Sequence, residues 1–296
     1  MQQNVDLIAH CVKARGPNQI HYANLTAAFK RVVGHVHPQF IEWMVREIQS
    51  DQIGHYPFYG LIPHIYFRPY RCMGDFELLA KFYDAYDKYH LGLRSKYDLT
   101  ASDWDAYVLS LPCSQSLFNR EAYLLKRIGQ CIEKTGALSV LDIACGNGRL
   151  MKKLLEKYPH IQVVGIDSEP MAIEEAKKNT GRREYYEVVN ALKDLPDCDA
   201  DIVVSAGLFD YLPEVLGTRL LQRVQRHYDP DMIIVGNLTN HDSEPLMELL
   251  GWDLHYRNRI ELSNLVINGI WPKDVHYNCR VEHEPLEINL FLVMEK

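Results

Sequence analysis

Several features that would point to particular classes of protein are missing from this chain of 296 residues. Its seven cysteines include no Cys-x-x-Cys pair, which argues against a zinc site or a disulfide framework and fits a reducing cytoplasm. The net charge is −7 and the pI about 6.0, so the basic face of a dedicated nucleic-acid binder is not expected. No apolar run approaches the length of about 18 residues that spans a membrane.

Two further absences concern targeting and metals. The N-terminus lacks the basic start and long apolar core of a signal peptide, so we expect a cytoplasmic protein. Of the 13 histidines, only His35 and His37 are close together, and no neighbouring residue completes a recognisable ligand set, so we expect no metal site. The balance of 47% hydrophobic and 24% charged residues suits one large domain, or a core domain with an extension.

What the chain does contain is a turn of small residues between a buried strand and a helix. The β-branched and aliphatic run 139–143 predicts the strand, and the apolar spacing in 149–157 predicts the helix. Between them, Ala144, Gly146 and Gly148 have little or no side chain, which lets the backbone approach a ligand. Dinucleotides and S-adenosylmethionine commonly bind at such a turn. The alternative is an ordinary glycine turn of an α/β protein.

The details of the turn favour S-adenosylmethionine. The dinucleotide pattern needs a third small residue three positions after Gly148, where this chain has Met151. The pattern present is Asp-x-Ala-x-Gly-x-Gly, with Asp142 inside the end of the strand. It resembles motif I of the class I S-adenosylmethionine-dependent methyltransferases, in which alanine often replaces the first glycine. The resemblance implies that S-adenosylmethionine is the cofactor and that the turn Ala144–Gly148 lies under its methionine part.

A second acid stands at the separation that a nucleoside site requires. The apolar run 162–167 predicts a buried strand ending in Asp167, about 20 residues beyond the turn, where a carboxylate can accept both ribose hydroxyls. Asp167 or Ser168 can cap the next helix, and Pro170 fits its first turn. The resemblance places Asn190-Ala191 beside the adenine. The predicted cofactor-binding residues are Arg120, Asp142, Ala144, Cys145, Gly146, Asn147, Gly148, Asp167, Ser168, Met171, Asn190, Ala191, Ser205 and Gly207.

The order of elements predicts an α/β fold, a doubly wound seven-stranded Rossmann-like methyltransferase sheet with an N-terminal helical cap. Expected strands are 139–143, 162–167, 183–189, 200–205, 232–237, 275–283 and 286–295, and expected helices are 114–134, 149–157, 170–179 and 213–227. The last two strands adjoin without room for a helix, so we expect an antiparallel hairpin that turns at Glu284-Pro285. Residues 111–296 form the S-adenosylmethionine-binding domain in this interpretation.

Residues 1–110 differ in character and predict a helical cap or substrate region. The segments 24–33, 39–48 and 75–83 have amphipathic helical spacing. The stretch 54–74 carries prolines and many aromatic residues, and tyrosines cluster from Tyr83 to Tyr107. Aromatic rows at helical spacing usually pack in a core, and the alternative is that some line a substrate pocket. We expect this region to fold over the cofactor and to exclude water from the reaction.

The stretch 201–213 predicts the fourth strand and the turn after it. Ser205 and Gly207 let the backbone approach the sulfonium methyl group, and Asp210 and Tyr211 stand where methyltransferases place residues that face the acceptor. The predicted catalytic residues are Tyr211, Asp210 and Ser205. Arg120, on the helix before the first strand, can grip a carboxylate of cofactor or substrate through its bidentate fork. A solvated surface arginine is the alternative.

Several segments are similar to one bacterial group, the extracellular-factor 3-hydroxypalmitic acid methyl ester biosynthesis methyltransferases. They are Gly207-Leu-Phe-Asp-Tyr-Leu212, Val235-Gly-Asn237, Gly251-Trp-Asp-Leu-His-Tyr-Arg257 and Glu261-Leu262. The N-terminal region does not match, which leaves the acceptor open. The resemblance implies a small-molecule acceptor, with a carboxylate or hydroxyl oxygen as nucleophile, in bacterial secondary or signalling metabolism. A carboxylate needs no general base, whereas a hydroxyl would need Asp210 or Tyr211. Neither nucleic acid nor membrane is an expected partner, and a homodimer is compatible with the sequence.

Two other functions would keep the same cofactor pocket. In an intramolecular cyclase of the azetidine-2-carboxylate synthase type, the cofactor's own amine displaces its thioether, and methylthioadenosine is released without a second substrate. The aromatic N-terminal region, with no obvious long acyl groove, is compatible with that reaction. A non-catalytic module that keeps the fold is the third interpretation, and the intact Asp142, Gly146, Gly148 and Asp167 argue against it. Methyl transfer is the preferred interpretation.

Overall fold

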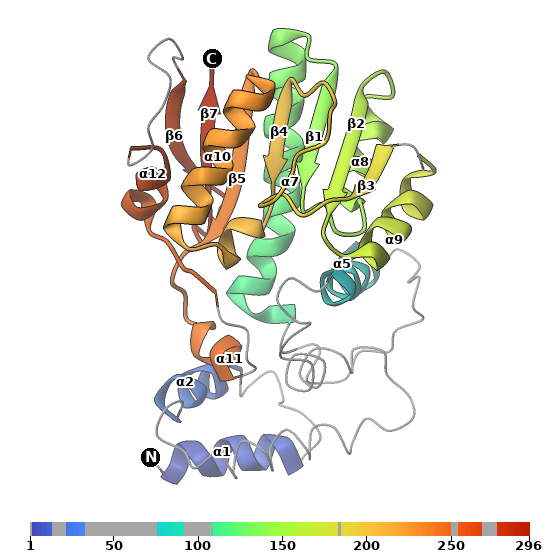
Figure 1. Cartoon of the computed structure of the whole chain (residues 1–296). Coiled ribbons are helices and arrows are strands. Elements are labelled where there is room, and N and C mark those ends of the chain that lie inside the picture. The colour runs from blue at the N-terminus through green and yellow to red at the C-terminus, as the bar shows by residue number, and fades with distance from the viewer. Residues whose placement is uncertain are drawn as a thin grey trace. The chain divides into compact units, whose positions relative to one another are not determined.

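The computed structural model of the chain describes residues 2–13, 22–32, 76–91, 107, 109–182, 185–249, 254–267 and 277–296. The chain divides into two compact units (Figure 1). The first is Met1–Phe118 together with His241–Asp253, and the second is Asn119–Asn240 together with Leu254–Lys296. A segment from the C-terminal half therefore joins the N-terminal unit. The domain division at residue 110 stays a prediction from the sequence.

The second unit is built on the predicted seven-stranded sheet. Its strands are β1 (Ser139–Ile143), β2 (Gln162–Asp167), β3 (Tyr186–Val188), β4 (Ile202–Ser205), β5 (Met232–Leu238), β6 (Asn278–His283) and β7 (Asn289–Glu295). The strand order is β3-β2-β1-β4-β5-β7-β6, and β7 is antiparallel to both of its neighbours while the other pairs are parallel. The expected C-terminal hairpin is confirmed.

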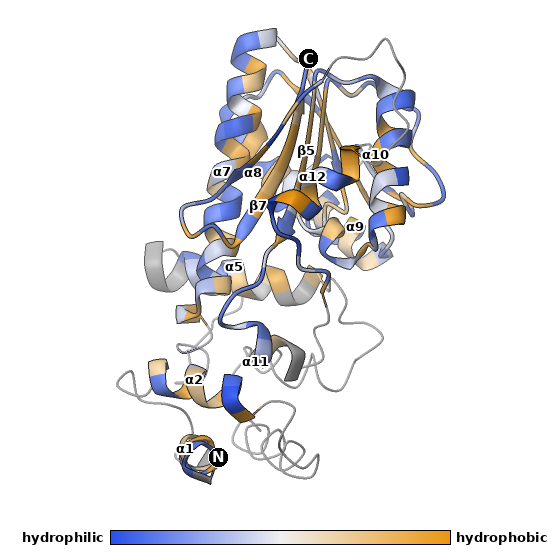
Figure 2. Cartoon of the chain, turned by 90° about the vertical axis from the view of Figure 1, so that its left-hand side faces the viewer, coloured by the Kyte–Doolittle hydropathy of each residue, from blue (hydrophilic) through white to orange (hydrophobic). Residues whose placement is uncertain are grey.

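Helices cover both faces of the sheet, which explains why its central strands are nearly continuous apolar runs. Every residue of β1, β4 and β5 is buried. One core joins the sheet to α7 (Pro112–Thr135), α8 (Arg149–Lys157) and α9 (Pro170–Thr180), and the other joins it to α10 (Glu214–Tyr228) and α12 (Arg259–Ile267). In the side view, α7 and α8 lie on one face of the strands and α10 on the other (Figure 2). The predicted doubly wound fold is confirmed.

Local sequence explains where the helices near the site begin and end. Gly148 precedes α8 with a φ of 69°, a conformation that glycine adopts without steric cost. Pro170 occupies the first turn of α9, where its missing N–H would have no partner in any case. Gly181 ends α9, also with a φ of 69°, and its amide donates to the carbonyl of Lys177 at 3.0 Å.

Some elements differ from those that the sequence predicts. β3 begins at Tyr186 rather than at 183, and the helices α1 (Gln2–Lys13), α11 (Glu244–Leu249) and α12 were not predicted. α11 is six residues long, too short to show a helical period. In α12, Leu262 and Leu265 are buried while Ile260 and Ile267 are exposed, so its apolar residues do not form one face. The predicted helix 39–48 and the stretch 54–74 lie outside the described residues.

The N-terminal unit is helical in its described parts. α2 (Tyr22–Val32) packs against α1 and against α11, which is orange beside the blue α2 in Figure 1, and Lys30 pairs with Asp242 at 2.8 Å. The unit also contains α5 (Phe76–Leu91) and the first turns of α7. Tyr86 of α5 stacks on Phe118 of α7 with ring centroids 3.8 Å apart, which favours the packing interpretation of these aromatics. No helix among the described ranges has the length and apolar character needed to cross a membrane.

Candidate active site

The candidate site lies where the strand order of the sheet reverses. β2 and β3 follow β1 on one side, while β4 and β5 lie on the other, so β1 and β4 flank the reversal. In open α/β sheets, ligands bind beyond the carboxyl ends of the strands at this point. Apart from Asp142 inside β1 and Arg120 on α7, the predicted site residues lie at or just beyond the carboxyl ends of β1, β2, β3 and β4. The fold therefore brings four distant segments to one edge of the sheet.

The turn after β1 owes its shape to three left-handed residues. The φ angles are 60° at Ala144, 54° at Gly146 and 69° at Gly148. Glycine adopts this region freely, whereas alanine pays about 1–2 kcal/mol for it. The amide of Cys145 donates to the carbonyl of Ile166 at 3.0 Å and ties the turn to β2. The turn leads directly into α8, so backbone N–H groups gather where a polar ligand can accept from them.

Asp167 is held at the end of β2 by two backbone amides. Its Oδ2 accepts from the amide of Gly146 at 3.0 Å, and its Oδ1 accepts from the amide of Glu169 at 3.0 Å. Burial raises the pKa of Asp167, and these two bonds oppose the rise. An ionised carboxylate has about four acceptor sites, so both oxygens keep capacity for further donors. Such a fixed, partly used carboxylate suits a pair of ribose hydroxyls.

Asp142 is a buried acid inside β1, with 2% of its surface exposed. Its Oδ1 has no hydrogen-bond partner among the described residues. Desolvation and the nearby charge of Asp167 raise the pKa of Asp142 to about 8, while Arg120 acts in the opposite direction. Leaving a buried polar atom without a partner costs about 1–3 kcal/mol, so such an atom in a native fold calls for an explanation. A ligand that brings an ammonium donor would satisfy it.

Arg120 is the buried cation of the site. Its side chain comes from α7, and its Nη1 donates to the carbonyl of Ala206, just after β4, at 3.2 Å. Its charge lowers the pKa of both Asp142 and Asp210. The burial of Arg120 argues against the solvated surface arginine that the sequence also allowed. The site thus combines one buried guanidinium with two buried carboxyl groups.

Two of the predicted catalytic residues form hydrogen bonds with backbone groups of the protein. Ser205 Oγ donates to the carbonyl of Ile143 at 2.9 Å, and Asp210 Oδ1 accepts from the amide of Leu238 at 2.6 Å. Desolvation raises the pKa of Asp210 to about 7, and the bond to Leu238, Arg120 and Arg257 all act against the rise. Tyr211 is half-buried and follows Asp210 in the short 3-10 helix η4 (Leu208–Tyr211). The catalytic role of these residues stays a prediction.

Arg257 belongs to the site although it was not predicted from the sequence as a site residue. It is buried and its charge acts on Asp210, although 47 positions separate the two residues in the chain. Arg257 served only as a mark of family resemblance, because no local pattern shows where a side chain from the C-terminal segment will lie.

Of the two residues expected beside the adenine, Asn190 is exposed and Ala191 is buried. Asn190 Oδ1 accepts from the amide of Leu192 at 3.0 Å. The carbonyl of Ala191 accepts from Arg223 Nη1 at 3.1 Å, so α10 supports this loop. Met171, the second residue of α9, has 58% of its surface exposed and is close in sequence to Asp167. Ser168 is exposed, Cys145 is buried, and Asn147 accepts through its carbonyl from Asn179 Nδ2 at 2.9 Å.

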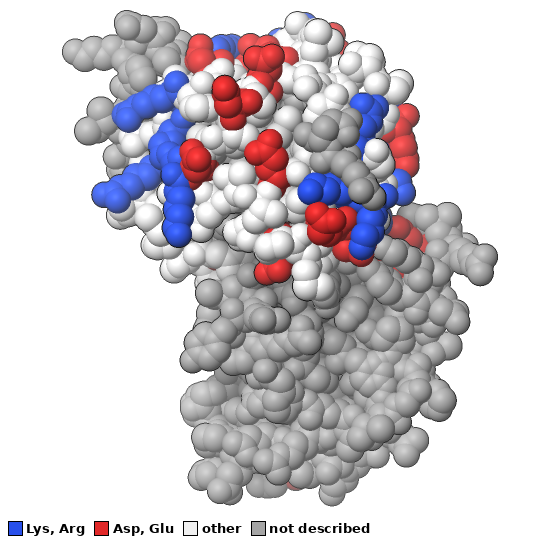
Figure 3. All heavy atoms as spheres, turned by 45° about the vertical axis from the view of Figure 1, so that its right-hand side comes forward, with Lys and Arg blue, Asp and Glu red and all other residues white. Residues whose placement is uncertain are grey.

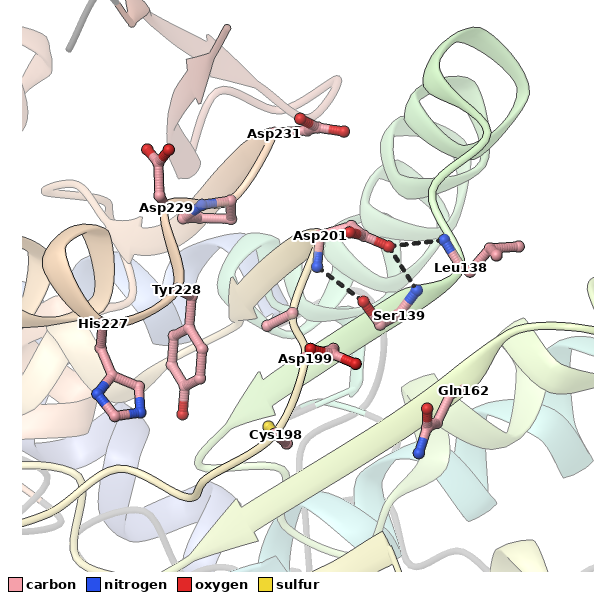
Figure 4. A pocket seen from close by; sticks show the side chains of 12 residues that line it. Leu138, Ser139, Gln162, Cys198, Asp199, Asp201, His227, Tyr228, Asp229 and Asp231 are labelled. Carbon is pink, nitrogen blue, oxygen red and sulfur yellow. Dashed lines mark hydrogen bonds between the residues drawn. The ribbon is translucent and has the colours of Figure 1, made fainter. Parts of the chain in front are cut away.

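At the opposite edge of the sheet, where the strands begin, the structure has a hollow of about 480 Å³ (Figure 4). Its lining includes the acids Asp199, Asp201, Asp229 and Asp231. Asp201 Oδ2 accepts from the amides of Leu138 and Ser139 at 2.8 and 3.0 Å, and Lys296 pairs with Asp229 at 2.9 Å. These bonds connect residues at the beginning of β1 and β4 and fix Lys296 at the end of the chain, so we assign Asp201 and Asp229 a structural role.

Charged side chains of both signs occupy the face drawn in Figure 3. Lysine and arginine gather in two separate groups there, with aspartate and glutamate between and above them. Among the described residues of that face, the basic side chains do not form one continuous surface of the kind that binds a nucleic acid backbone.

The family model described as "Methyltransferase domain" matches residues 140–231, which include the turn after β1, Asp167 and the segment from Ser205 to Tyr211. The chain contains a class I S-adenosylmethionine-dependent methyltransferase domain. S-adenosylmethionine is the cofactor of this domain, as the sequence predicts. The match covers the edge of the sheet where the candidate site lies and leaves the N-terminal unit unassigned.

Relatives of the methyltransferase domain act on different acceptors. A trans-aconitate 2-methyltransferase from Azoarcus sp. (strain BH72) is 25% identical over 114 residues, which are 38% of this chain and 44% of the relative. A ribosomal protein L11 methyltransferase from Burkholderia cenocepacia (strain HI2424) is 43% identical over 88 residues, 29% of this chain and 28% of the relative. The chain thus spans less than half the length of these relatives.

A solved structure agrees with the fold over a larger part of the chain. A protein from Bordetella parapertussis, described as a possible exported protein, superimposes with a TM-score of 0.59 at 16% identity. The match covers 77% of this chain and 80% of that one. At this identity the likeness concerns the fold alone.

The residues at the site fit the cofactor of the methyltransferase domain. Asp142 offers a buried oxygen that no residue in the described ranges bonds to, and Asp167 offers acceptor capacity at the end of β2. Gly146 and Gly148 keep the turn free of side chains. When bound, S-adenosylmethionine supplies a methyl group attached to a positively charged sulfur. The Asp142 carboxyl and the Asp167 carboxyl are the groups that would hold its polar ends.

Proposed function

We propose that the protein transfers the methyl group of S-adenosylmethionine to an oxygen of a small carboxylic acid. The observation that carries the proposal is the buried guanidinium of Arg120 beside the turn after β4. Its Nη1 bonds to the carbonyl of Ala206 and lies 3.0 Å from the place that a Cβ on Gly207 would take. Arginine recognises carboxylates through a planar fork, and a desolvated arginine does so most strongly.

The hydrogen bonding of Asp210 favours a carboxylate over a hydroxyl acceptor. A carboxylate is ionised at neutral pH and attacks without a general base, whereas a hydroxyl needs one. Asp210 Oδ1 already accepts from the amide of Leu238 at 2.6 Å, so this carboxyl oxygen is held within the protein. The task of the chain is then to align an ionised acid with the methyl group and to keep water away.

Two likenesses support a small acid as the acceptor. The name of the Azoarcus relative gives trans-aconitate, a carboxylic acid, as its substrate. The finer resemblance to the 3-hydroxypalmitic acid methyl ester group would make a 3-hydroxy fatty acid the acceptor, in bacterial secondary or signalling metabolism. The L11 relative represents the competing class, a protein acceptor. The comparisons lend no support to the cyclase alternative.

A panel of acceptors tests the proposal. The purified protein is incubated with S-adenosylmethionine and one acceptor at a time. The acceptors are trans-aconitate, 3-hydroxypalmitate and ribosomal protein L11, and the products are identified by mass spectrometry. We expect S-adenosylhomocysteine together with a small acid that has gained one methyl group. Methylation of L11 and of neither acid would refute the assignment.

Variants on α7 show whether Arg120 serves the acceptor. In Arg120→Lys the planar fork is lost, and we expect the KM for the acid to rise about tenfold or more, because hydrogen bonds to charged groups are among the strongest. Arg127→Lys is the matched control, since Arg127 lies on the same helix and pairs with Glu282 and Glu295 instead. If the affinity for S-adenosylmethionine falls and the KM for the acid does not change, Arg120 binds the cofactor.

We also propose three broader features that the sequence predicts. Residues 1–110 act as a cap over the methyltransferase domain, the protein works in the cytoplasm, and it can form a homodimer. The helical and aromatic character of the N-terminal region supports the first, and the seven cysteines without a Cys-x-x-Cys pair support the second.

A further inference from the structure

Arg257 fastens the turn that follows β4. The side chain is 6% exposed, and its Nη1 donates to the carbonyl of Phe209 at 2.7 Å and to Asn237 Oδ1 at 2.5 Å. Its Nη2 donates to the carbonyl of Leu212. One guanidinium thus bridges both ends of the segment Phe209–Leu212, which contains Asp210 and Tyr211, and joins it to the end of β5.

Backbone bonds connect the same three segments. The amide of His255 donates to the carbonyl of Asp210 at 2.7 Å, and the amide of Arg257 donates to the carbonyl of Leu238 at 3.0 Å. Asn237 Nδ2 donates to the carbonyl of His255 at 2.9 Å. The segment 255–257 therefore lies against the turn after β4 and against the end of β5 at once.

The buried charge of Arg257 is compensated within this cluster. Three oxygen acceptors take its hydrogen bonds, and the carboxyl of Asp210 is near enough for its pKa to be lowered by Arg257. A lysine at this position would carry the charge but could not reach all three acceptors from one planar group. A cluster of this kind holds one arrangement of its members, because every alternative leaves a buried polar atom without a partner.

The chain leaves the second unit and returns to it between the segments that form this cluster. Between Leu238 and His255 the chain leaves the second unit at Asn240, contributes His241–Asp253 to the N-terminal unit, and returns at Leu254. The two ends of this excursion are therefore the two segments that hold the turn after β4. Within the second unit, the segments on either side of the excursion are held together by the bonds of Asn237 and Arg257.

We propose that Arg257 is a positioning residue for the acceptor side of the site, fixing the segment Phe209–Leu212 while leaving the cofactor contacts unchanged. None of its bonds goes to the turn Ala144–Gly148 or to Asp167. The inference rests on the proposed function, because it takes the turn after β4 to face the acceptor. The bonds by which Arg257 holds the segment Phe209–Leu212 and Asn237, called the clamp below, can be tested without any acceptor.

Hydrogen exchange measured by mass spectrometry tests the clamp on the whole chain. In Arg257→Lys we expect amides in peptides covering 208–212 and 254–258 to exchange about tenfold faster or more, since bonds to a charged group are lost. Amides in a peptide covering 140–150 should exchange as in the wild type. Arg259→Lys is the matched control, because Arg259 lies two positions further, is exposed and bonds to Val281 and Glu287.

Binding and kinetics then show which side of the site Arg257 serves. The dissociation constant for S-adenosylmethionine, measured by calorimetry, should stay within about twofold of wild type in Arg257→Lys, because no contact to that half of the site is lost. With the acid found in the acceptor panel, kcat/KM should fall about tenfold to a hundredfold, as expected for a misplaced acceptor. If no acid is methylated, the exchange and binding data still decide about the clamp.

Two results would overturn the inference. One is exchange in 208–212 that is equally slow in Arg257→Lys and Arg259→Lys. The other is a loss of S-adenosylmethionine affinity as large as the loss of acceptor turnover, which would mean general damage to the fold. Asn237→Asp covers the case in which Arg257→Lys does not fold. It keeps an acceptor for Arg257 and removes the Nδ2 donor to the carbonyls of Leu238 and His255, so exchange should rise in 254–258 and stay slow in 208–212.

Discussion

Replacing Gly148 by alanine should weaken both the fold and the cofactor site. Gly148 has a φ of 69°, which costs an L-residue about 1–2 kcal/mol. A Cβ at this position would lie 3.0 Å from the Cβ and 3.2 Å from the Cα of Ala176, and 3.3 Å from the Tyr186 hydroxyl. The backbone of α9 cannot swing aside as the end of a flexible side chain can, so overpacking adds about 1–3 kcal/mol.

Gly181 provides a control with the same backbone strain and none of the contacts. Its φ is also 69°, but an added Cβ would meet no atom within 4 Å. We expect Gly181→Ala to lower the free energy of unfolding by about 1–2 kcal/mol and Gly148→Ala by about 2–5 kcal/mol. The difference between the two variants isolates the contact between α8 and α9.

Urea titrations of the cofactor-free variants, followed by circular dichroism, give the two free energies of unfolding. Calorimetry with S-adenosylmethionine then shows the second effect, because Gly148→Ala shifts the turn under the cofactor and Gly181→Ala does not. Equal losses of stability in both variants would refute the packing argument. Wild-type affinity for S-adenosylmethionine in a folded Gly148→Ala protein would refute the placement of the turn.

Three further predictions concern the cofactor, pH and the cap. Asp167→Ala should weaken S-adenosylmethionine binding about tenfold to a hundredfold, which is about 1.5–3 kcal/mol, as measured by calorimetry. The control variant Glu169→Ala should bind as the wild type does. Unaltered affinity in Asp167→Ala would show that Asp167 does not bind the cofactor. The folded pKa of about 8 at Asp142 exceeds the unfolded value near 3.9, so its stabilising contribution is lost as pH rises from about 4 through about 8. The unfolding free energy of Asp142→Asn should therefore fall less than that of the wild type between pH 5 and pH 8 in urea titrations, and parallel curves would contradict the shift. S-adenosylmethionine should slow limited proteolysis within 54–74, and equal cleavage rates with and without it would show that this segment is not an ordered lid.

The sheet could be predicted from the sequence because its signals are local. β1 and β2 have the predicted bounds, since both are short β-branched runs bounded by turn residues. α12 could not be predicted, because buried Leu262 and Leu265 alternate with exposed Ile260 and Ile267 without a helical period. The excursion of 241–253 into the N-terminal unit has no sequence signal, since it depends on packing between α2 and α11.

The candidate site divides in the same way. Asp142, Gly148 and Asp167 follow from spacing, because each occupies a fixed place in a strand–turn–helix unit. Asp210 was predicted from its place after β4, but its bond to Leu238 and its burial depend on β5, which is a neighbour only in the folded sheet. The positioning role proposed for Arg257 depends on contacts across 45 and 48 positions of the chain, which no local pattern reveals.

The central claim, methyl transfer from S-adenosylmethionine, is tested most directly by the product formed from that cofactor. The purified protein is incubated with S-adenosylmethionine carrying a deuterated methyl group, first alone and then with the acids of the acceptor panel. We expect S-adenosylhomocysteine only when an acid is present, in equal amount to an ester that carries the label. Stoichiometric methylthioadenosine formed without any acceptor, and abolished in Tyr211→Phe or Asp210→Asn, would contradict methyl transfer and establish intramolecular cyclisation instead.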